Sequence, residues 1–220
     1  MFRRLNRFCR SRYVSAAVVA AAVGFLLLSG FSTAFAQAPS VVRVEEDWEL
    51  VVSDPFADSA APQVTCVISP VGHLNWHHVA FELNHQSVAS FVPGGMQLVV
   101  WHGETMDHTH KHPSSAVMST DNETVRWTQA LNLSAGVLRF EVVGGTSTTW
   151  GSFGGSGQLR HSESTLLTSL DGYSPDVSVA NSGVGFAGNR VSSLVLKEVR
   201  VYLSDGTQVV DSTPRVVHTP

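Results

Sequence analysis

The sequence has only two cysteines, and their positions exclude a disulfide bond within the mature chain. Cys9 lies in an N-terminal segment that we expect to be removed on export, which leaves Cys66 as the single remaining cysteine. Cys66 shares one strand face with Val64 and Ile68, which is typical of a small buried residue; a nucleophilic or intermolecular role is the alternative. The mature fold must therefore be stabilised by its core.

Basic residues are also scarce, with 14 Lys and Arg against 18 Asp and Glu. Five of the arginines lie within the first 12 residues and no acidic residue does, so the rest of the chain is strongly acidic. Nucleic acids and anionic membranes attract basic surfaces. We therefore expect neither as a partner.

Helical patterns and familiar catalytic motifs are missing. No stretch keeps a helical period over three turns, and there is no G-x-S-x-G elbow, P-loop or H-E-x-x-H zinc helix. Residues 183–188 match the letters of G-x-G-x-x-G, but a strand-like pattern follows where a dinucleotide site needs a helix. The sequence thus favours a non-catalytic protein, with no catalytic residue assigned and no cofactor expected.

Residues 1–36 have the composition of a secretory signal peptide. An apolar stretch over residues 14–28 follows the arginines, and Ala34 and Ala36 form a small-residue cleavage site. An uncleaved anchor is the alternative, but the apolar run is shorter than the roughly 20 residues that a spanning helix needs. We expect cleavage before Gln37, a secreted or periplasmic protein without stable membrane insertion, and a single domain over residues 37–220.

The pattern of the mature chain is β throughout. Short β-branched or alternating runs are separated by Gly, Pro, Asn, Asp and Ser. The expected strands are residues 41–52, 63–69, 74–83, 96–101, 124–133, 137–143 and 192–203, followed by a hairpin turn at Asp205-Gly206. Many strands at this spacing predict an all-β, two-sheet antiparallel β-sandwich or jelly roll.

Three segments carry a resemblance: residues 44–50 (VEEDWEL), 148–155 (TTWGSFGG) and 181–203 (NSGVGFAGNRVSSLVLKEVRVYL). Together they resemble a family of uncharacterised exported bacterial proteins, and the closing strands are similar to those of concanavalin A-like lectin and laminin-G sandwiches. The resemblance implies a concanavalin A-like fold and no particular function. The Glu-x-Asp-x-x-Glu constellation of the glycosidases in that superfold is not found here, nor is the metal loop of legume lectins.

Three alternate histidines form the best metal-binding pattern: His108, His110 and His112. Residues two apart lie on one face of a strand, and imidazole suits Zn²⁺ or Cu²⁺. The outer two are about 13 Å apart in a straight strand, so one ion would bind two histidines and a ligand from elsewhere. Nearby candidates are Asp107, His102 and Glu104. The alternative is a histidine-rich hairpin tip without metal. Surface or interface positions are expected for the scattered histidines, which are His73, His77, His78 and His85.

Aromatic and polar residues in loops are the candidates for saccharide binding. Trp150 and Phe153 lie in a glycine-rich segment, residues 144–157, that we expect to be irregular, and sugar rings stack on exposed aromatic faces. Tyr173 and Asn181 are further loop candidates. Core packing is the alternative for Trp150 and the expectation for the other tryptophans, which are Trp48, Trp76, Trp101 and Trp127.

Three carboxylates share one face of the first expected strand: Glu45, Asp47 and Glu49. Such a row suits a catalytic cleft, but a solvated strand face is the favoured interpretation. The sequence as a whole favours an exported, non-catalytic binding protein, with polysaccharide as its partner. The alternatives are a structural or adhesive envelope protein and a histidine-ligated metal-binding protein.

Overall fold

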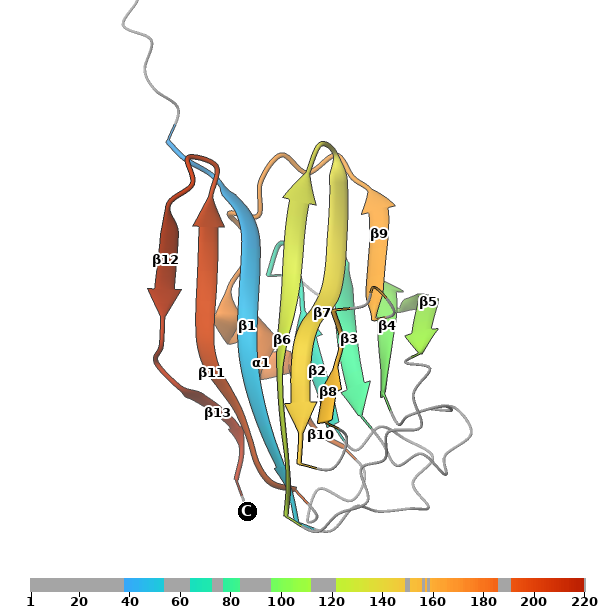
Figure 1. Ribbon diagram of the computed structural model, residues 1–220. Helices are drawn as coiled ribbons and strands as arrows, with labels where there is room; N and C mark the ends of the chain where they lie inside the picture. The colour runs from blue at the N-terminus through green and yellow to red at the C-terminus, as the bar shows by residue number, and fades with distance from the viewer. Residues whose placement is uncertain are drawn as a thin grey trace, which may run out of the picture. The chain divides into compact units, whose positions relative to one another are not determined.

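The computed structural model describes residues 38–53, 64–72, 77–83, 96–111, 122–148, 151–155, 157, 159–185 and 191–219. Residues from 38 onward form an all-β sandwich of two antiparallel sheets with one short helix (Figure 1), which confirms the expected fold class. Within the described part of the chain, no helix has the length and apolarity to cross a membrane.

The larger sheet has eight strands. They are β1 (Val41–Val52), β6 (Glu123–Ser134), β7 (Val137–Ser147), β8 (Gly151–Phe153), β9 (Arg160–Ser164), β11 (Val191–Leu203), β12 (Gln208–Asp211) and β13 (Arg215–His218). The hydrogen-bonded order is β12-β11-β1-β6-β7-β8, with β13 also on β11 and β9 also on β7. Strands β8 and β9 pair with different stretches of β7.

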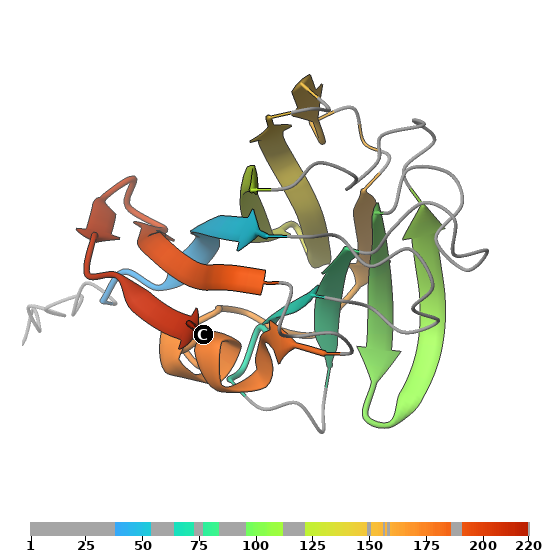
Figure 2. The ribbon, with the colours of Figure 1, turned by 90° about the horizontal axis from the view of Figure 1, so that it is seen from below.

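The smaller sheet has five strands in the order β10-β2-β3-β4-β5. They are β2 (Val64–Ile68), β3 (His78–Leu83), β4 (Met96–His102), β5 (Thr105–Lys111) and β10 (Gly183–Val184). The helix α1 (Pro175–Asn181) lies beside β2 and β13, as Figure 2 shows. A proline in its first turn is preset for helical geometry, and an extended residue, Ser182, ends it after seven residues.

The expected strands all correspond to observed ones in the residues that the structure describes. The sequence pattern found them because each alternates apolar and polar residues or is strongly β-branched. The glycine-rich segment 144–157 was expected to be irregular, yet it extends β7 to Ser147 and supplies β8. Strands β9, β10 and β13 and the helix α1 were also missed, since β9 is mainly polar, β10 and β13 have two and four residues, and α1 is shorter than three helical turns.

Aromatic rings fill the space between the sheets. Trp48 on β1 and Trp127 on β6 are buried and stacked with ring centres 6.2 Å apart. Phe81 of the smaller sheet meets Trp127 edge to face at 5.3 Å, so the two sheets contact each other directly. The core positions expected for these tryptophans are confirmed, whereas Trp101 is only partly buried and Trp76 lies outside the described residues.

Cys66 lies in this core with no exposed surface, as expected for a small buried residue. Burial raises the pKa of its thiol well above the ordinary value, and the charge of Glu46 adds to the shift. The thiolate form that a nucleophile needs is therefore disfavoured.

A buried carboxylate, Glu46, is the main polar group of the core. It points inward from β1 and has no exposed surface. Its oxygens accept hydrogen bonds from Trp48 Nε1 at 3.0 Å, Gln129 Nε2 at 2.7 Å and the Tyr173 hydroxyl at 2.7 Å, and Ser178 of α1 also bonds to it. These donors come from β1, β6 and the α1 region, so one side chain joins three parts of the fold.

Replacing Glu46 with Gln is expected to change how stability depends on pH. Burial raises the pKa of Glu46 above its ordinary value of 4.5 against the opposing hydrogen bonds, so the folded state holds a proton more tightly than the unfolded state. As the pH rises above about 4.5, the wild-type protein should lose stability relative to Glu46→Gln, by at most about 1.4 kcal/mol per pH unit. Urea unfolding at a series of pH values measures the difference.

Glu45→Gln is the matched control, because Glu45 faces outward from the same strand. Burial acts to raise its pKa, but hydrogen bonds from Arg200, Arg43 and Tyr202 outweigh it and the pKa is lowered from 4.5. Its stabilising contribution is present above about pH 4.5 and is lost as the pH falls through the folded pKa, which is the opposite sign. The same pH trend for both variants would contradict the assignment of Glu46.

Two adjacent glycines in β7 provide a second prediction. A Cβ on Gly145 would overlap the ring of Phe153, whereas a Cβ on Gly144 would meet nothing within 4 Å. Gly145→Ala should therefore lower the free energy of unfolding by about 1–3 kcal/mol through overpacking. Gly144→Ala should change it by no more than about 0.5 kcal/mol. Equal urea-unfolding midpoints for the two variants would show that Phe153 does not pack on Gly145 in solution.

Candidate metal centre

Five histidines and two carboxylates gather where one edge of the larger sheet meets the smaller sheet. His77 directly precedes β3 and His102 ends β4. The other members lie on two strands: Asp107, His108 and His110 on β5, and His161 and Glu163 on β9. Strand β9 lies beside β4 and β5 in both ribbon views (Figures 1 and 2). Segments more than 80 residues apart in the chain therefore meet in one cluster, which we call the histidine cluster.

Local strand geometry explains the positions. A turn at Gly103, which has a positive φ of 59°, folds β5 back along β4 and places His102 near Asp107. Strand β9 pairs with β7 in the register that sets His161 opposite Phe140 and Glu163 opposite Leu138. Because residues two apart share a strand face, His161 and Glu163 project to the same side.

Glu163 lies at the centre of the inner part of the cluster. Its carboxylate is 2.8 Å from His77 Nδ1, 3.5 Å from His102 Nε2 and 3.4 Å from His161 Nε2. One ligand atom from each of His77, His102 and Glu163 can be chosen so that all three atoms lie within 4.8 Å of one another. We call these three residues the inner group.

The outer part of the cluster extends the same network toward solvent. Asp107 Oδ2 is 3.5 Å from His102 Nδ1 and 2.8 Å from His108 Nδ1. His110 Nε2 is 3.1 Å from His161 Nδ1. Exposure rises outward, from 0% for the His77 side chain to 45% for His102 and 52% for His108. The cluster is thus anchored in the core and open at one side.

Burial keeps the innermost histidine neutral. It lowers the pKa of His77 to about 3, with further lowering from the nearby His102 and His161. Burial also lowers the pKa of His110, and His161 and His108 add to that shift. A neutral imidazole has a free lone pair on one ring nitrogen, which is the form that ligates a metal.

The distances suit a tetrahedral transition-metal ion. Zn²⁺ binds imidazole nitrogen and carboxylate oxygen at about 2.0–2.2 Å, so two ligand atoms on one ion lie about 3.3 Å apart. The contacts of Glu163 to His77 and His102, at 2.8 and 3.5 Å, lie on either side of that value. Asp107 stands behind His102 Nδ1, where a carboxylate can orient a metal-bound imidazole.

The structure brings together part of the expected metal pattern and adds residues that sequence reasoning missed. His108 and His110 share a face of β5 with near-parallel rings, as their spacing predicts, and His102 and Asp107 lie beside them. Glu104 is exposed at the β4–β5 turn, and His112 lies outside the described residues.

His77 was expected at the surface but is fully buried, because its ring packs against His102 and Phe140. His161 and Glu163 were not predicted as site residues. Their H-x-E spacing could have indicated two ligands on one strand face. It points to this site only when β9 is known to face β4 and β5.

The residues expected to bind a saccharide have other roles where the structure describes them. Phe153 is 5% exposed and stacks near Phe81, so its ring has no free face for a sugar. The Tyr173 hydroxyl is bonded to Glu46 and its pKa is raised by burial. Asn181 is exposed, and its Nδ2 donates to the Val177 carbonyl within α1 at 2.8 Å. Trp150 lies outside the described residues.

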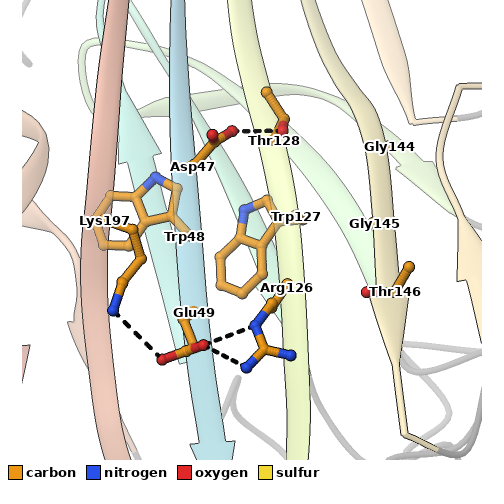
Figure 3. A pocket seen from close by; sticks show the side chains of 10 residues that line it. All are labelled: Asp47, Trp48, Glu49, Arg126, Trp127, Thr128, Gly144, Gly145, Thr146 and Lys197. Carbon is orange, nitrogen blue, oxygen red and sulfur yellow. Dashed lines mark hydrogen bonds and ion pairs between the residues drawn. The ribbon is translucent and has the colours of Figure 1, made fainter. Parts of the chain in front are cut away.

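A separate cleft of about 400 Å³ lies on the outer face of the larger sheet. Figure 3 shows its lining from β11, β1, β6 and β7. Its charged and polar side chains are paired across the strands: Glu49 with Arg126 at 2.7 Å and with Lys197 at 3.8 Å, and Asp47 with Thr128 at 2.6 Å. Gly144 leaves bare backbone at one side, where a Cβ would meet nothing within 4 Å.

Glu45, Asp47 and Glu49 lie on the outer face of β1, and each pairs with a neighbouring arginine. Asp47 and Glu49 also line this cleft. Burial acts to raise the pKa of Asp47, but hydrogen bonds from Arg200 and Thr128 outweigh it and the pKa is lowered. The pKa of Glu45 is lowered in the same way. A general acid needs a raised pKa, so these two carboxylates are poorly suited to that role.

No protein-family model matches the chain, and no curated protein matches its sequence. The function is therefore inferred from the residues and contacts described above.

Proposed function

We propose that this is an exported, non-catalytic protein that binds a transition-metal ion such as Zn²⁺ or Cu²⁺ through His77, His102 and Glu163. The observation that carries the proposal is the convergence of these three ligand atoms within 4.8 Å from three separate segments. The signal-like composition of residues 1–36 supports the export part of the proposal.

The ligand set favours this class of ion over the alkaline-earth ions. Ca²⁺ takes six to eight oxygen ligands and Mg²⁺ retains several waters, whereas two imidazoles and a carboxylate suit Zn²⁺, Cu²⁺ or Ni²⁺. Three protein ligands leave a fourth position open on the exposed side of His102. That position accepts water or one further ligand.

The surroundings of the inner group support the same assignment. His77 is held by Phe140 edge to face at 4.9 Å and by His102 stacked at 4.2 Å, so its ring cannot swing away. Asp107 Oδ2 lies 3.5 Å from the opposite nitrogen of His102, where a carboxylate can orient a metal-bound imidazole. These contacts restrict the His77 ring, whose Nδ1 lies 2.8 Å from the Glu163 carboxylate.

Removing one inner ligand should remove one bound ion. His102→Ala is the suitable variant because His102 is half exposed, whereas His77 is fully buried. Equilibrium dialysis of the untagged full chain against Zn²⁺, followed by elemental analysis, should show one ion fewer per chain than in the wild type. Asp107→Asn should retain the ion with an affinity about 10-fold to 100-fold weaker.

His218→Ala is the matched control, because it removes a histidine from β13 at the far side of the larger sheet. The control should bind as much Zn²⁺ as the wild type. Zn²⁺ at about 100 times its dissociation constant should also stabilise the wild type against urea by about 2.7 kcal/mol. Background Zn²⁺ in the wild type, or equal Zn²⁺ in His102→Ala and His218→Ala, would refute the proposal.

Polysaccharide binding is a second candidate, favoured by the cleft on the outer face of the larger sheet. Its size suits a small ligand, and its lining contains two carboxylates and two cations, so it fits an uncharged ligand rich in hydroxyl groups. Such a ligand would bind by hydrogen bonds to Arg126, Lys197 and Glu49, because Trp48 and Trp127 beneath the cleft are buried.

Filling the cleft tests this candidate. Gly144→Val places a side chain in open space and should abolish retardation in affinity gels that contain the bound polysaccharide. Gly183→Val on β10 is the control, since a Cβ there also meets nothing within 4 Å. Retardation should persist with chelator, because the cleft does not use the histidine cluster. No retardation of the wild type by any glycan, or equal retardation of both variants, would exclude the cleft.

A further inference from the structure

Three histidines of the cluster remain outside the inner group: His108, His110 and His161. Two come from β5 of the smaller sheet and one from β9 of the larger sheet. Their ring centres are 4.8 Å apart for His108 and His161, 5.2 Å for His110 and His161, and 6.2 Å for His108 and His110. They form a triangle of imidazoles at the seam between the sheets.

Two sides of this triangle, those from His161 to His108 and to His110, match the dimensions of a metal site, and the His108–His110 side is longer. Three imidazoles bound tetrahedrally to one ion have ring centres about 5 Å apart, since each nitrogen lies about 2 Å from the ion. The 3.1 Å separation of His110 Nε2 and His161 Nδ1 is also close to the roughly 3.3 Å between two ligand atoms on one ion. The His108 side chain is half exposed, so solvent leaves room for its ring to turn toward the other two.

The triangle borders the inner group without sharing its ligand atoms. His161 turns Nδ1 toward His110 and Nε2 toward Glu163, at 3.1 and 3.4 Å. Asp107 lies between His102 and His108 and contacts the Nδ1 atom of each. Each of these two residues therefore contacts members of both sets.

We propose that the histidine cluster binds two transition-metal ions, one in the inner group and a second held by His108, His110 and His161. The proposal rests on the proposed metal-binding function and adds a second site to it. Binding of the second ion replaces the direct contact between His110 and His161 with two metal–nitrogen bonds, and any proton on those nitrogens is released to solvent.

The test counts ions in variants that separate the two sites. The untagged full chain is dialysed against Zn²⁺ and should bind two ions per chain. His110→Ala should bind one, because it removes a ligand of the second site, and His102→Ala should also bind one. The variant His102→Ala with His110→Ala should bind none, while His218→Ala should bind two.

The outcomes distinguish the two proposals. One ion in the wild type that is kept in His110→Ala and lost in His102→Ala would overturn the second site and leave the inner one standing. No ion in the wild type would overturn both. One ion lost in either variant would mean a single site built from the whole cluster, which also overturns the second site. Matching urea-unfolding midpoints without Zn²⁺ confirm that the variants are folded, since His102 and His108 are about half exposed and His110 is only partly buried.

Discussion

The buried carboxylate of Glu46 fixes the register on which the rest of the structure depends. Strand β1 pairs with β11 on one side and β6 on the other over most of its length. A slip of one residue would expel Glu46 from its hydrogen-bond donors and bring Glu45 and Asp47 inside, away from Arg200. Glu46 has four hydrogen-bond donors inside the sandwich, and Glu45 and Asp47 bond to Arg200 outside it. Only one register keeps both arrangements, because an unpaired buried charge is costly.

This register extends across the larger sheet to the histidine cluster. Strand β6 pairs with β1 and then with β7, and β7 pairs with β9. Each pairing carries the inward and outward alternation to the next strand, so His161 and Glu163 face the smaller sheet while Ser162 is exposed. On the other sheet, the tight turn at Gly103 sets β5 against β4 in the same way. The cluster is thus a product of two independent registers that meet at one seam.

Sequence reasoning recovered what depends on local periodicity and missed what depends on pairing between distant strands. The alternation of buried and exposed residues in β1 and β11 and the shared face of His108 and His110 could be predicted, because both depend only on residues close together in the chain. Burial of His77 was not, since its environment comes from His102 and Phe140.

The residues expected to bind a saccharide show the same difference between local sequence pattern and long-range packing. A glycine-rich sequence with aromatic residues was interpreted as a loop, but Gly145 is required beneath Phe153, which makes the segment part of the core. Exposure of an aromatic ring is a property of the packed fold and not of its flanking residues. The cleft formed by Asp47, Glu49 and Arg126 has no local signature either, because its walls come from different strands.

Metal ions at the seam would do for this chain what disulfide bonds do for many exported domains. Within the described part of the chain the one cysteine, Cys66, is unpaired by disulfide and buried in the core, so it provides no covalent link between the sheets. An ion held by the inner group joins Glu163 of the larger sheet to His102 of the smaller sheet, and its binding free energy adds to that of folding because the unfolded chain lacks the site. The ligand atoms of His77, His102 and Glu163 converge from both sides of this seam. An ion bound there would link the two sheets, which gives the position of the cluster a structural reason as well as a binding one.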